Sequence, residues 1–222
     1  MTAAPEPHPS ALDRVVMAIH ALPALRAAGP ARVVVGLAGP PAAGKSTLAA
    51  ALVARLNAAP EGPAAPATLL PMDGFHLDNA VLRARGLLAR KGAPQTFDAD
   101  GLLHLLRRAR APGGGVVHPV FDRARDLAVA GAGVIDPAVR VVVVEGNYLL
   151  LDRPPWRDLR ALMDLTVMLR ADPDVLRARL LARWRGHGLA PEAARRRAED
   201  NDLPNARTEI ADSAPADLEV AD

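Results

Sequence analysis

The sequence predicts an α/β fold in which helices cover both faces of a parallel β-sheet. Short β-branched apolar runs alternate along the chain with longer segments of helical periodicity, which is the pattern of strand–helix–strand units. Half of the 222 residues are apolar, so the chain can bury a substantial core, and its length suits a single domain over residues 1–222. Because only 3% of the residues are aromatic, that core consists mainly of Leu, Val and Ala.

The elements follow from periodicity and from residues that begin or end helices. Residues 1–9 are rich in proline, and we expect them to be disordered; Ser10 then caps a helix that extends to about Ala28. The predicted strands are 32–38, 68–72, 140–144 and 164–169, with a short extended piece at 116–121. The predicted helices are 44–57, 78–88, 100–110, one that begins at Asp172-Pro173, and one over 191–202.

Composition excludes several classes of function. The chain has no cysteine, which excludes disulfides, thiolate metal sites and cysteine nucleophiles. A net charge of +2 gives little support for a nucleic-acid partner. The N-terminus has prolines where a signal peptide needs a basic and then an apolar stretch, and no apolar run reaches about 18 residues. We therefore expect a cytoplasmic protein with no membrane and no nucleic-acid partner.

The clearest motif is GPPAAGKST, which begins at Gly39 and lies between a predicted strand and a predicted helix. It has the G-x-x-x-x-G-K-[ST] spacing of a phosphate-binding P-loop, in which glycines let successive N–H groups point at an anion. The helix that follows directs its positive end at the same place. Lys45 can reach the outer phosphates and the Ser46 hydroxyl can hold Mg²⁺. The predicted nucleotide-binding residues are Gly39, Ala43, Gly44, Lys45, Ser46 and Thr47.

Two acids follow other predicted strands. Asp73 comes after the second strand and Glu145 after the third. Ligands of parallel sheets gather beyond the carboxyl ends of the strands, so both acids are expected near the P-loop. There, one carboxylate can help to hold a metal ion and another can accept the proton of an attacking hydroxyl. Capping and surface roles are the alternatives for each acid.

Other motifs narrow the class of P-loop protein. Neither lysine of the chain, Lys45 or Lys91, lies in the N-K-x-D motif of a GTPase, and there is no L-S-G-G-Q transporter signature. The apolar run before Glu145 lacks the acidic pair common in motor ATPases. A small-molecule kinase fits best.

Five segments of the chain, taken in order, resemble the uridine kinase, pantothenate kinase and phosphoribulokinase superfamily. They are GPPAAGKST, PMDGFH, ARKGAPQTFD, HPVFDR and VVVVEGNYLL, and the likeness runs from about Val33 to Arg207. The resemblance implies a P-loop NTPase of the nucleoside-monophosphate-kinase-like type that transfers the γ-phosphoryl of ATP to a hydroxyl. It also implies that Asp73 is the catalytic base and that Glu145 joins Ser46 at Mg²⁺.

The same resemblance places a lid at about 177–205, whose arginines would stabilise the charge of the transferring phosphoryl. Arg177, Arg179, Arg183 and Arg185 are all candidates. We favour Arg183 and Arg185, because Gly186 and Gly188 beside them leave a mobile lid room to hinge.

Polar and aromatic residues of these motifs are candidates for the acceptor pocket. All three phenylalanines of the chain lie within the motifs, which suggests that they wall a pocket. The candidates are Asp73, Phe75, His76, Asp98, His118, Phe121, Asp122 and Arg123, together with Phe97.

The identity of the acceptor stays open. HPVFDRARDLAVAG resembles a bacterial nucleoside/nucleotide kinase-like subgroup linked to fructose uptake, which makes a sugar or polyol plausible, and uridine kinase-like and pantothenate kinase-like activities are alternatives. A catalytically inactive nucleotide-binding regulatory protein and a nucleic-acid-associated kinase are alternatives of other classes. The sequence also leaves open whether the chain is a monomer or a homodimer.

Overall fold

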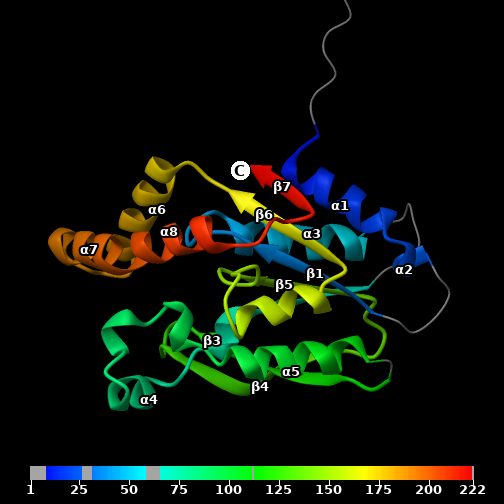
Figure 1. Cartoon of the computed structure of the whole chain (residues 1–222), viewed down its shortest axis with the longest axis horizontal. Helices are drawn as coiled ribbons and strands as arrows, with labels where there is room; N and C mark the ends of the chain where they lie inside the picture. Colours follow the sequence, from blue (N-terminus) through cyan, green and yellow to red (C-terminus); the bar gives the residue numbers. More distant parts are fainter. Residues whose placement is uncertain (1–8, 27–31, 59–65, 112, 222) are drawn as a thin grey trace, which may run out of the picture.

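The computed structural model describes residues 9–26, 32–58, 66–111 and 113–221 (Figure 1). Residues 1–8 of the segment expected to be disordered, and the expected helix end at Ala28, lie outside these ranges. The prediction of one helix from Ser10 onward is wrong, because the first helix ends at Ala21, Leu22 is extended and a separate short helix begins at Pro23. Within them, none of the helices combines the length and the apolar character that crossing a bilayer requires.

A parallel sheet forms the centre of the described chain. Its strands have the order β2-β5-β1-β6-β7, and every neighbouring pair is parallel. The strands are β1 (Val33–Ala38), β2 (Ala67–Pro71), β5 (Val141–Gly146), β6 (Leu165–Arg170) and β7 (Leu218–Ala221). The four predicted strands are confirmed with small shifts of their ends. The sequence reasoning missed β7, a four-residue strand at the sheet edge.

Two hydrophobic cores cover the two faces of the sheet. Along β1, Val33, Val35 and Leu37 belong to one core, and Val34 and Ala38 to the other, as alternation in a strand requires. The first core is closed by α1 (Ala11–Ala21), the short α2 (Pro23–Arg26) and α3 (Lys45–Ala58). The second is closed by α5 (Ala99–Arg110) and the 3-10 helix η4 (Trp156–Leu162). The α/β fold with helices on both faces is therefore as predicted.

An antiparallel hairpin of β3 (Val116–Asp122) and β4 (Leu127–Ile135) lies outside the main sheet. It packs against the 3-10 helix η1 (Met72–Phe75), and so closely that a Cβ on Gly74 would lie 2.4 Å from the carbonyl oxygen of Pro119. The extended piece at 116–121 was predicted, but β4 was not, because its Ala and Gly residues give little strand signal.

The segment between β2 and α5 is less helical than expected. The predicted helix 78–88 is only α4 (Asn79–Ala84), which begins at an Asp78 cap, and the chain turns at Gly86 with a φ of +67°. The 3-10 turns η2 (Leu88–Arg90) and η3 (Pro94–Thr96) follow.

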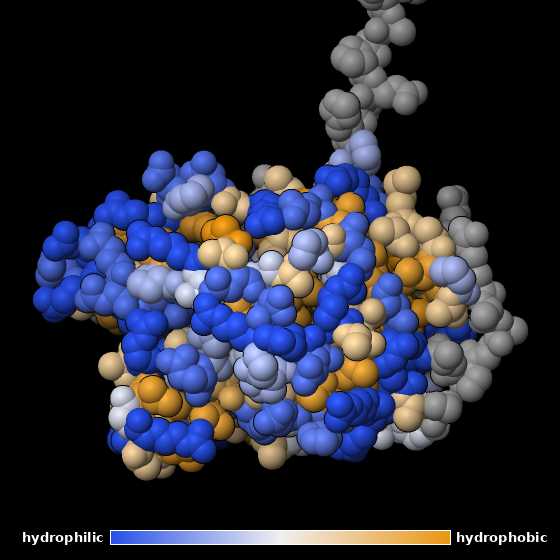
Figure 2. All heavy atoms as spheres, viewed as in Figure 1, coloured by the Kyte–Doolittle hydropathy of each residue, from blue (hydrophilic) through white to orange (hydrophobic). Residues whose placement is uncertain are grey.

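The predicted lid, residues 177–205, falls on a group of C-terminal helices that extend to one side of the sheet (Figure 1). Hydrophilic side chains cover its outer end in the view of Figure 2. The helices are α6 (Pro173–Gly186), α7 (Pro191–Arg197), the π-helix η5 (Ala198–Asp202) and α8 (Leu203–Asp212). The expected starts at Pro173 and Pro191 are correct; α8 was not anticipated.

Candidate active site

The ends of three neighbouring strands bring the candidate catalytic residues together. Glu145 of β5 pairs with Leu37 of β1 on one side and with Pro71 of β2 on the other. The P-loop begins two residues after Leu37, and Asp73 lies two residues after Pro71. Because all three strands are parallel, the P-loop, Asp73 and Glu145 leave the sheet at the same edge, as the sequence predicted.

The P-loop has a backbone that its glycines make possible. Gly39 and Gly44 have φ values of +150° and +93°, and a Cβ on Gly39 would lie 2.6 Å from the carbonyl oxygen of Leu169. The N–H of Ala43 donates to the carbonyl of Pro40 at 3.1 Å, so this group is used within the loop. Helix α3 begins at Lys45, and the first N–H groups of a helix have no partner within it. The start of α3 therefore offers donors and a positive dipole end to an anion.

Lys45, Ser46 and Glu145 form a connected group at this edge. The Lys45 ammonium is buried and donates to the carbonyl of Pro40 at 2.9 Å; burial lowers its pKa, against the attraction of Glu209, Glu145 and Asp73. The Ser46 hydroxyl donates to Oε1 of Glu145 at 3.3 Å. Burial, reinforced by the nearby Asp73, raises the pKa of Glu145, while Lys45 and Ser46 oppose that shift.

A cavity of about 1270 Å³ joins these groups to the rest of the predicted site. It exceeds the usual range of small-ligand pockets, about 300–1,000 Å³, so it has room for a nucleotide and a second small molecule. Twelve of the residues predicted from the sequence line this cavity: Gly44, Lys45, Ser46, Thr47, Asp73, His76, Phe97, Phe121, Arg123, Glu145, Arg179 and Arg183.

Asp73 lies at the start of η1 and is held by the hairpin. The Arg123 guanidinium, just beyond β3, donates to Oδ2 of Asp73 at 2.8 Å. This ion pair fixes the carboxylate at the cavity wall and engages one of its two oxygens. The position of Arg123 on the hairpin therefore leaves Oδ1 as the oxygen of Asp73 that is not bonded to this guanidinium.

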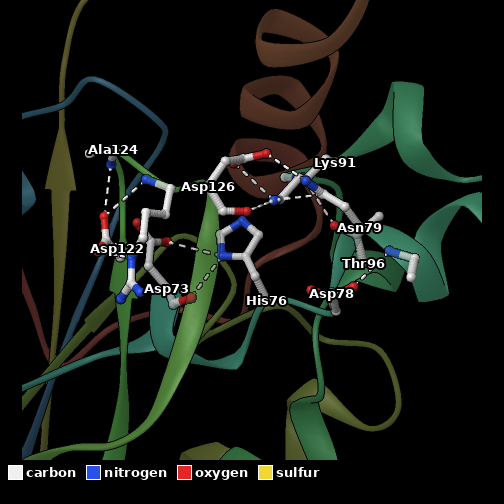
Figure 3. Close-up of polar contacts among 12 residues, drawn as sticks. Asp73, His76, Asp78, Asn79, Lys91, Thr96, Asp122, Ala124 and Asp126 are labelled. Carbon is white, nitrogen blue, oxygen red and sulfur yellow. Dashed lines mark hydrogen bonds and ion pairs between the residues drawn. The ribbon is translucent and has the colours of Figure 1, made fainter.

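His76 lies between two aromatic rings, with its centroid 4.0 Å from that of Phe97 and 4.6 Å from that of Phe121. Its Nδ1 is 2.8 Å from the carbonyl oxygen of Asp73; because a carbonyl only accepts, Nδ1 carries the proton and Nε2 is an acceptor. Burial lowers the pKa of His76, which keeps the ring neutral near pH 7. Figure 3 shows the ring between Asp73 and the Lys91–Asn79 pair.

Comparison with known proteins agrees with this geometry. Residues 34–191 match the Phosphoribulokinase / Uridine kinase family, which is well over half of the chain. The chain belongs to this family of P-loop kinases.

Three similar proteins show how much of the chain the likeness covers. The protein YggC of Escherichia coli (strain K12), which is uncharacterised, is 37% identical over 203 residues, 91% of this chain and 83% of that protein. A candidate uridine kinase of Schizosaccharomyces pombe is 37% identical over 184 residues, 78% of this chain and 76% of that protein. A crystal structure of a candidate fructose transport system kinase from Silicibacter sp. TM1040 has a TM-score of 0.86 and 47% identity, and the likeness covers 95% of this chain and 99% of that one.

The candidate site also contains residues that sequence reasoning did not assign. The Lys91 ammonium donates to Oδ1 of Asn79 and to the backbone oxygen of Asp126, both at 2.8 Å, and pairs with the Asp126 carboxylate at 2.9 Å. It also lies 5.1 Å from the centre of the Phe121 ring. All four residues line the cavity. A signal was available for Lys91, because it and Lys45 are the only lysines of the chain.

Four residues predicted for the acceptor pocket do not line this cavity. Phe75 belongs to the hydrophobic core, and Asp98 caps α5 by accepting the N–H of Gly101. His118 is buried on β3 against Gly133, where a Cβ would meet its ring. Asp122 accepts the N–H groups of Ala124 and Arg125 and forms an ion pair with Arg125 (Figure 3). Phe75 therefore contributes to the core, and the other three side chains serve the local fold around the site.

The four arginines of α6 separate into two sets. Arg179 and Arg183 line the cavity, and Nη1 of Arg179 is 3.4 Å from the carbonyl oxygen of Ala42 in the P-loop. Burial lowers the pKa of Arg183. Arg177 forms an ion pair with Glu199, and Arg185 does not line the cavity. The structure therefore brings only one of the two favoured arginines, Arg183, to the site.

The part of the predicted lid formed by α7 and η5 is hydrogen-bonded to the segment that carries Lys91. Arg197 donates to the backbone oxygens of Ala89 and Lys91, and Asn201 donates to that of Lys91. Arg90 donates in turn to the backbone oxygen of Asp200 and to Asn205. These bonds connect both walls of the cavity.

Proposed function

We propose that this chain is an ATP- and Mg²⁺-dependent kinase that transfers the γ-phosphoryl group of ATP to a hydroxyl group of a small metabolite. The observation that carries the proposal is the meeting of Ser46, Asp73 and Glu145, from three separate strand ends, around one cavity that also holds Lys45. In phosphoryl transfer the protein mainly positions the reactants and stabilises negative charge, and these side chains supply both.

On the nucleotide side, the N–H groups at the start of α3 hold the phosphates, and Lys45 moves from Pro40 to neutralise their outer charge. Mg²⁺ takes oxygen ligands, with one or two carboxylates and the substrate phosphates. The Ser46 hydroxyl and the Glu145 carboxylate, 3.3 Å apart, fit this requirement and would hold the ion. When bound, Mg²⁺ would neutralise the charge that develops on the phosphates.

On the acceptor side, Asp73 receives the proton of the attacking hydroxyl. We assign Oδ1 to this role, because Oδ2 is engaged by Arg123. The acceptor oxygen forms a bond to the γ-phosphorus as the bond between that phosphorus and the β–γ bridging oxygen breaks, and ADP leaves with the electron pair. Arg179 and Arg183, from the lid at 177–205, stabilise the charge of the phosphoryl group in transfer.

A sugar or related polyol is the first acceptor class to test. The support is the 47% identity, over almost the whole of both chains, to a candidate fructose transport system kinase. The neutral His76, with Nε2 as an acceptor and with flanking aromatic rings, suits a hydroxylated ligand. Nucleosides and pantothenate are the alternatives, and the relative described as a candidate uridine kinase makes nucleosides the stronger of the two.

A coupled ADP-release screen tests the proposal. The purified chain is assayed with Mg²⁺ and ATP against sugars, nucleosides, pantothenate and glycerate, with Lys45→Ala as the matched inactive variant. We expect release that depends on one acceptor class, requires Mg²⁺ and is lost in Lys45→Ala. If ATP binds but no acceptor stimulates release, the proposal is wrong and a nucleotide-binding regulatory protein becomes the better description.

A further inference from the structure

A buried carboxyl group, Glu209 of α8, lies behind the P-loop. Its side chain is fully buried, and Oε1 accepts the N–H of Gly39, 170 residues earlier in the chain, at 2.8 Å. Its other oxygen, Oε2, is buried and has no hydrogen-bond partner among the described residues. Glu209 does not line the cavity, so it does not contact the ligands directly.

The bond to Gly39 acts at the point where the chain leaves β1 and enters the P-loop. Gly39 packs against the backbone of Leu169, and its φ of +150° is one that residues with a side chain rarely adopt. A buried N–H without a hydrogen-bond partner destabilises the structure that contains it. Glu209 therefore determines the direction of the first peptide group of the loop, and α8 connects that point to the end of the lid.

The surroundings of Glu209 favour its uncharged form. A buried carboxylate needs several donors or a direct cation, and here a single N–H contacts Oε1. The charged or titratable groups that face it are Lys45, Arg170 and Tyr148, and the Lys45 ammonium donates to Pro40 instead. Burial raises the pKa of Glu209 to about 8, although Lys45 and the N–H of Gly39 oppose the shift.

We propose that Glu209 is a positioning residue of the phosphate-binding loop, which in its uncharged form holds the N–H of Gly39 and fixes the first turn of the loop for the triphosphate of ATP. The proposal rests on the nucleotide binding proposed above. It assigns a function to a residue that lies outside the P-loop motif and outside the cavity.

The affinity for ATP should therefore depend on pH in a specific way. With a pKa of about 8, Glu209 is mostly neutral at pH 7 and ionises as the pH rises through 8. The ionised group places a negative charge behind the loop, and Lys45, which would offset it, is needed by the phosphates. ATP therefore prefers the protein in which Glu209 is protonated. A ligand with that preference loses affinity as the pH rises above the pKa of Glu209 in the ligand-free protein, by at most about tenfold per pH unit.

The test is the affinity for a non-hydrolysable ATP analogue with Mg²⁺, measured by calorimetry between pH 6.5 and 9.5 without an acceptor. We expect the wild-type chain to lose about tenfold in affinity between pH 8 and 9.5. Glu209→Gln, which keeps a carbonyl oxygen for Gly39 but cannot ionise, should bind like wild type at pH 7 and lose less than about threefold over that range. Glu209→Ala should bind about tenfold more weakly at pH 7. Asp212→Asn, which removes an exposed ion pair from the same helix, is the control and should follow wild type.

Two results would overturn the proposal for Glu209 and leave the proposed function standing. The Gln variant could lose affinity with pH as wild type does, which would assign the effect to Lys45, or it could bind as weakly as the Ala variant at pH 7, which would mean that the charge is required. A wild-type chain that binds the analogue at no pH would instead overturn the proposed function, and the role of Glu209 with it.

Discussion

The two halves of the cavity are built in different ways. The proposed nucleotide side comes from one continuous motif, GPPAAGKST, with Glu145 on the neighbouring strand, and the binding groups proposed for it are largely backbone N–H groups at the start of α3. The acceptor side is assembled from η1, α4, the turn after η2 and the β3–β4 hairpin, which span residues 72–135. One half is therefore specified locally, and the other depends on tertiary contacts.

The halves also differ in how their charges are paired. On the acceptor side, the two cations of residues 72–135 that line the cavity each have an acid beside them, Arg123 with Asp73 and Lys91 with Asp126. On the nucleotide side Lys45 donates to a carbonyl and is free to exchange it for phosphate oxygens. The nucleotide side is thus prepared for an anion, while the acceptor side offers balanced hydrogen-bonding groups, which suits an uncharged hydroxylated ligand.

Asp73→Asn should give the largest effect on kcat and should act on the acceptor side of the cavity alone. The amide cannot accept the proton of the acceptor hydroxyl, so we expect kcat to fall by about 10²-fold or more, while the affinity for ATP stays within about twofold. Steady-state kinetics and calorimetric ATP binding on the same preparation measure both quantities. Unchanged turnover would remove Asp73 from the role of base, and a parallel loss of ATP binding would show that the two halves are not independent.

Lys91→Met tests the acceptor side without touching the proposed base. The substitution keeps the apolar stem but removes the donors to Asn79 and Asp126. We expect the KM for the acceptor to rise about tenfold, because the wall formed by the hairpin and α4 loses its central hydrogen bonds, while the KM for ATP is unchanged.

Arg125→Met is the matched control for Lys91→Met. It removes a cation of the same hairpin whose ion pair with Asp122 lies outside the cavity, so acceptor KM should be close to that of wild type. Equal rises of the acceptor KM in both variants would mean that the hairpin was merely loosened and that Lys91 has no specific role.

The placement of the P-loop beside Asp73 and Glu145 could be predicted from the sequence because its determinants are local, although Gly39 and Ala43, which were also predicted to bind the nucleotide, do not line the cavity. The motif lies between a strand and a helix, and the alternation of elements places Asp73 and Glu145 at the ends of parallel strands beside it. Parallel pairing, which a buried apolar strand favours, brings the three strand ends to one edge of the sheet, whereas the register that makes Glu145 a neighbour of both Leu37 and Pro71 comes from the structure.

The acceptor side could be predicted only in part. Asp98 and Asp122 share their motifs with cavity residues, but a side chain one position along a turn can cap a helix or close a loop instead, as these two do. Glu209 carries no motif; its position becomes informative only when α8 packs behind the P-loop. The lid arginines had a usable signal: residues four apart on a helix share a face, which groups Arg179 with Arg183 and separates both from Arg185.

The lid arginines give a direct comparison on one helix, with expected effects no larger than that of Lys91→Met. Arg179 contacts the P-loop backbone and lines the cavity, whereas Arg185 lies outside it. We expect Arg179→Met to lower kcat about tenfold, through lost stabilisation of the transferring charge, and Arg185→Met to change it less than about twofold, as for an ordinary surface residue. Both are measured with the acceptor found in the screen, and thermal unfolding checks that α6 is intact. If Arg185→Met were the more damaging variant, the lid would have to adopt, during the reaction, an arrangement that turns the opposite face of α6 toward the phosphates.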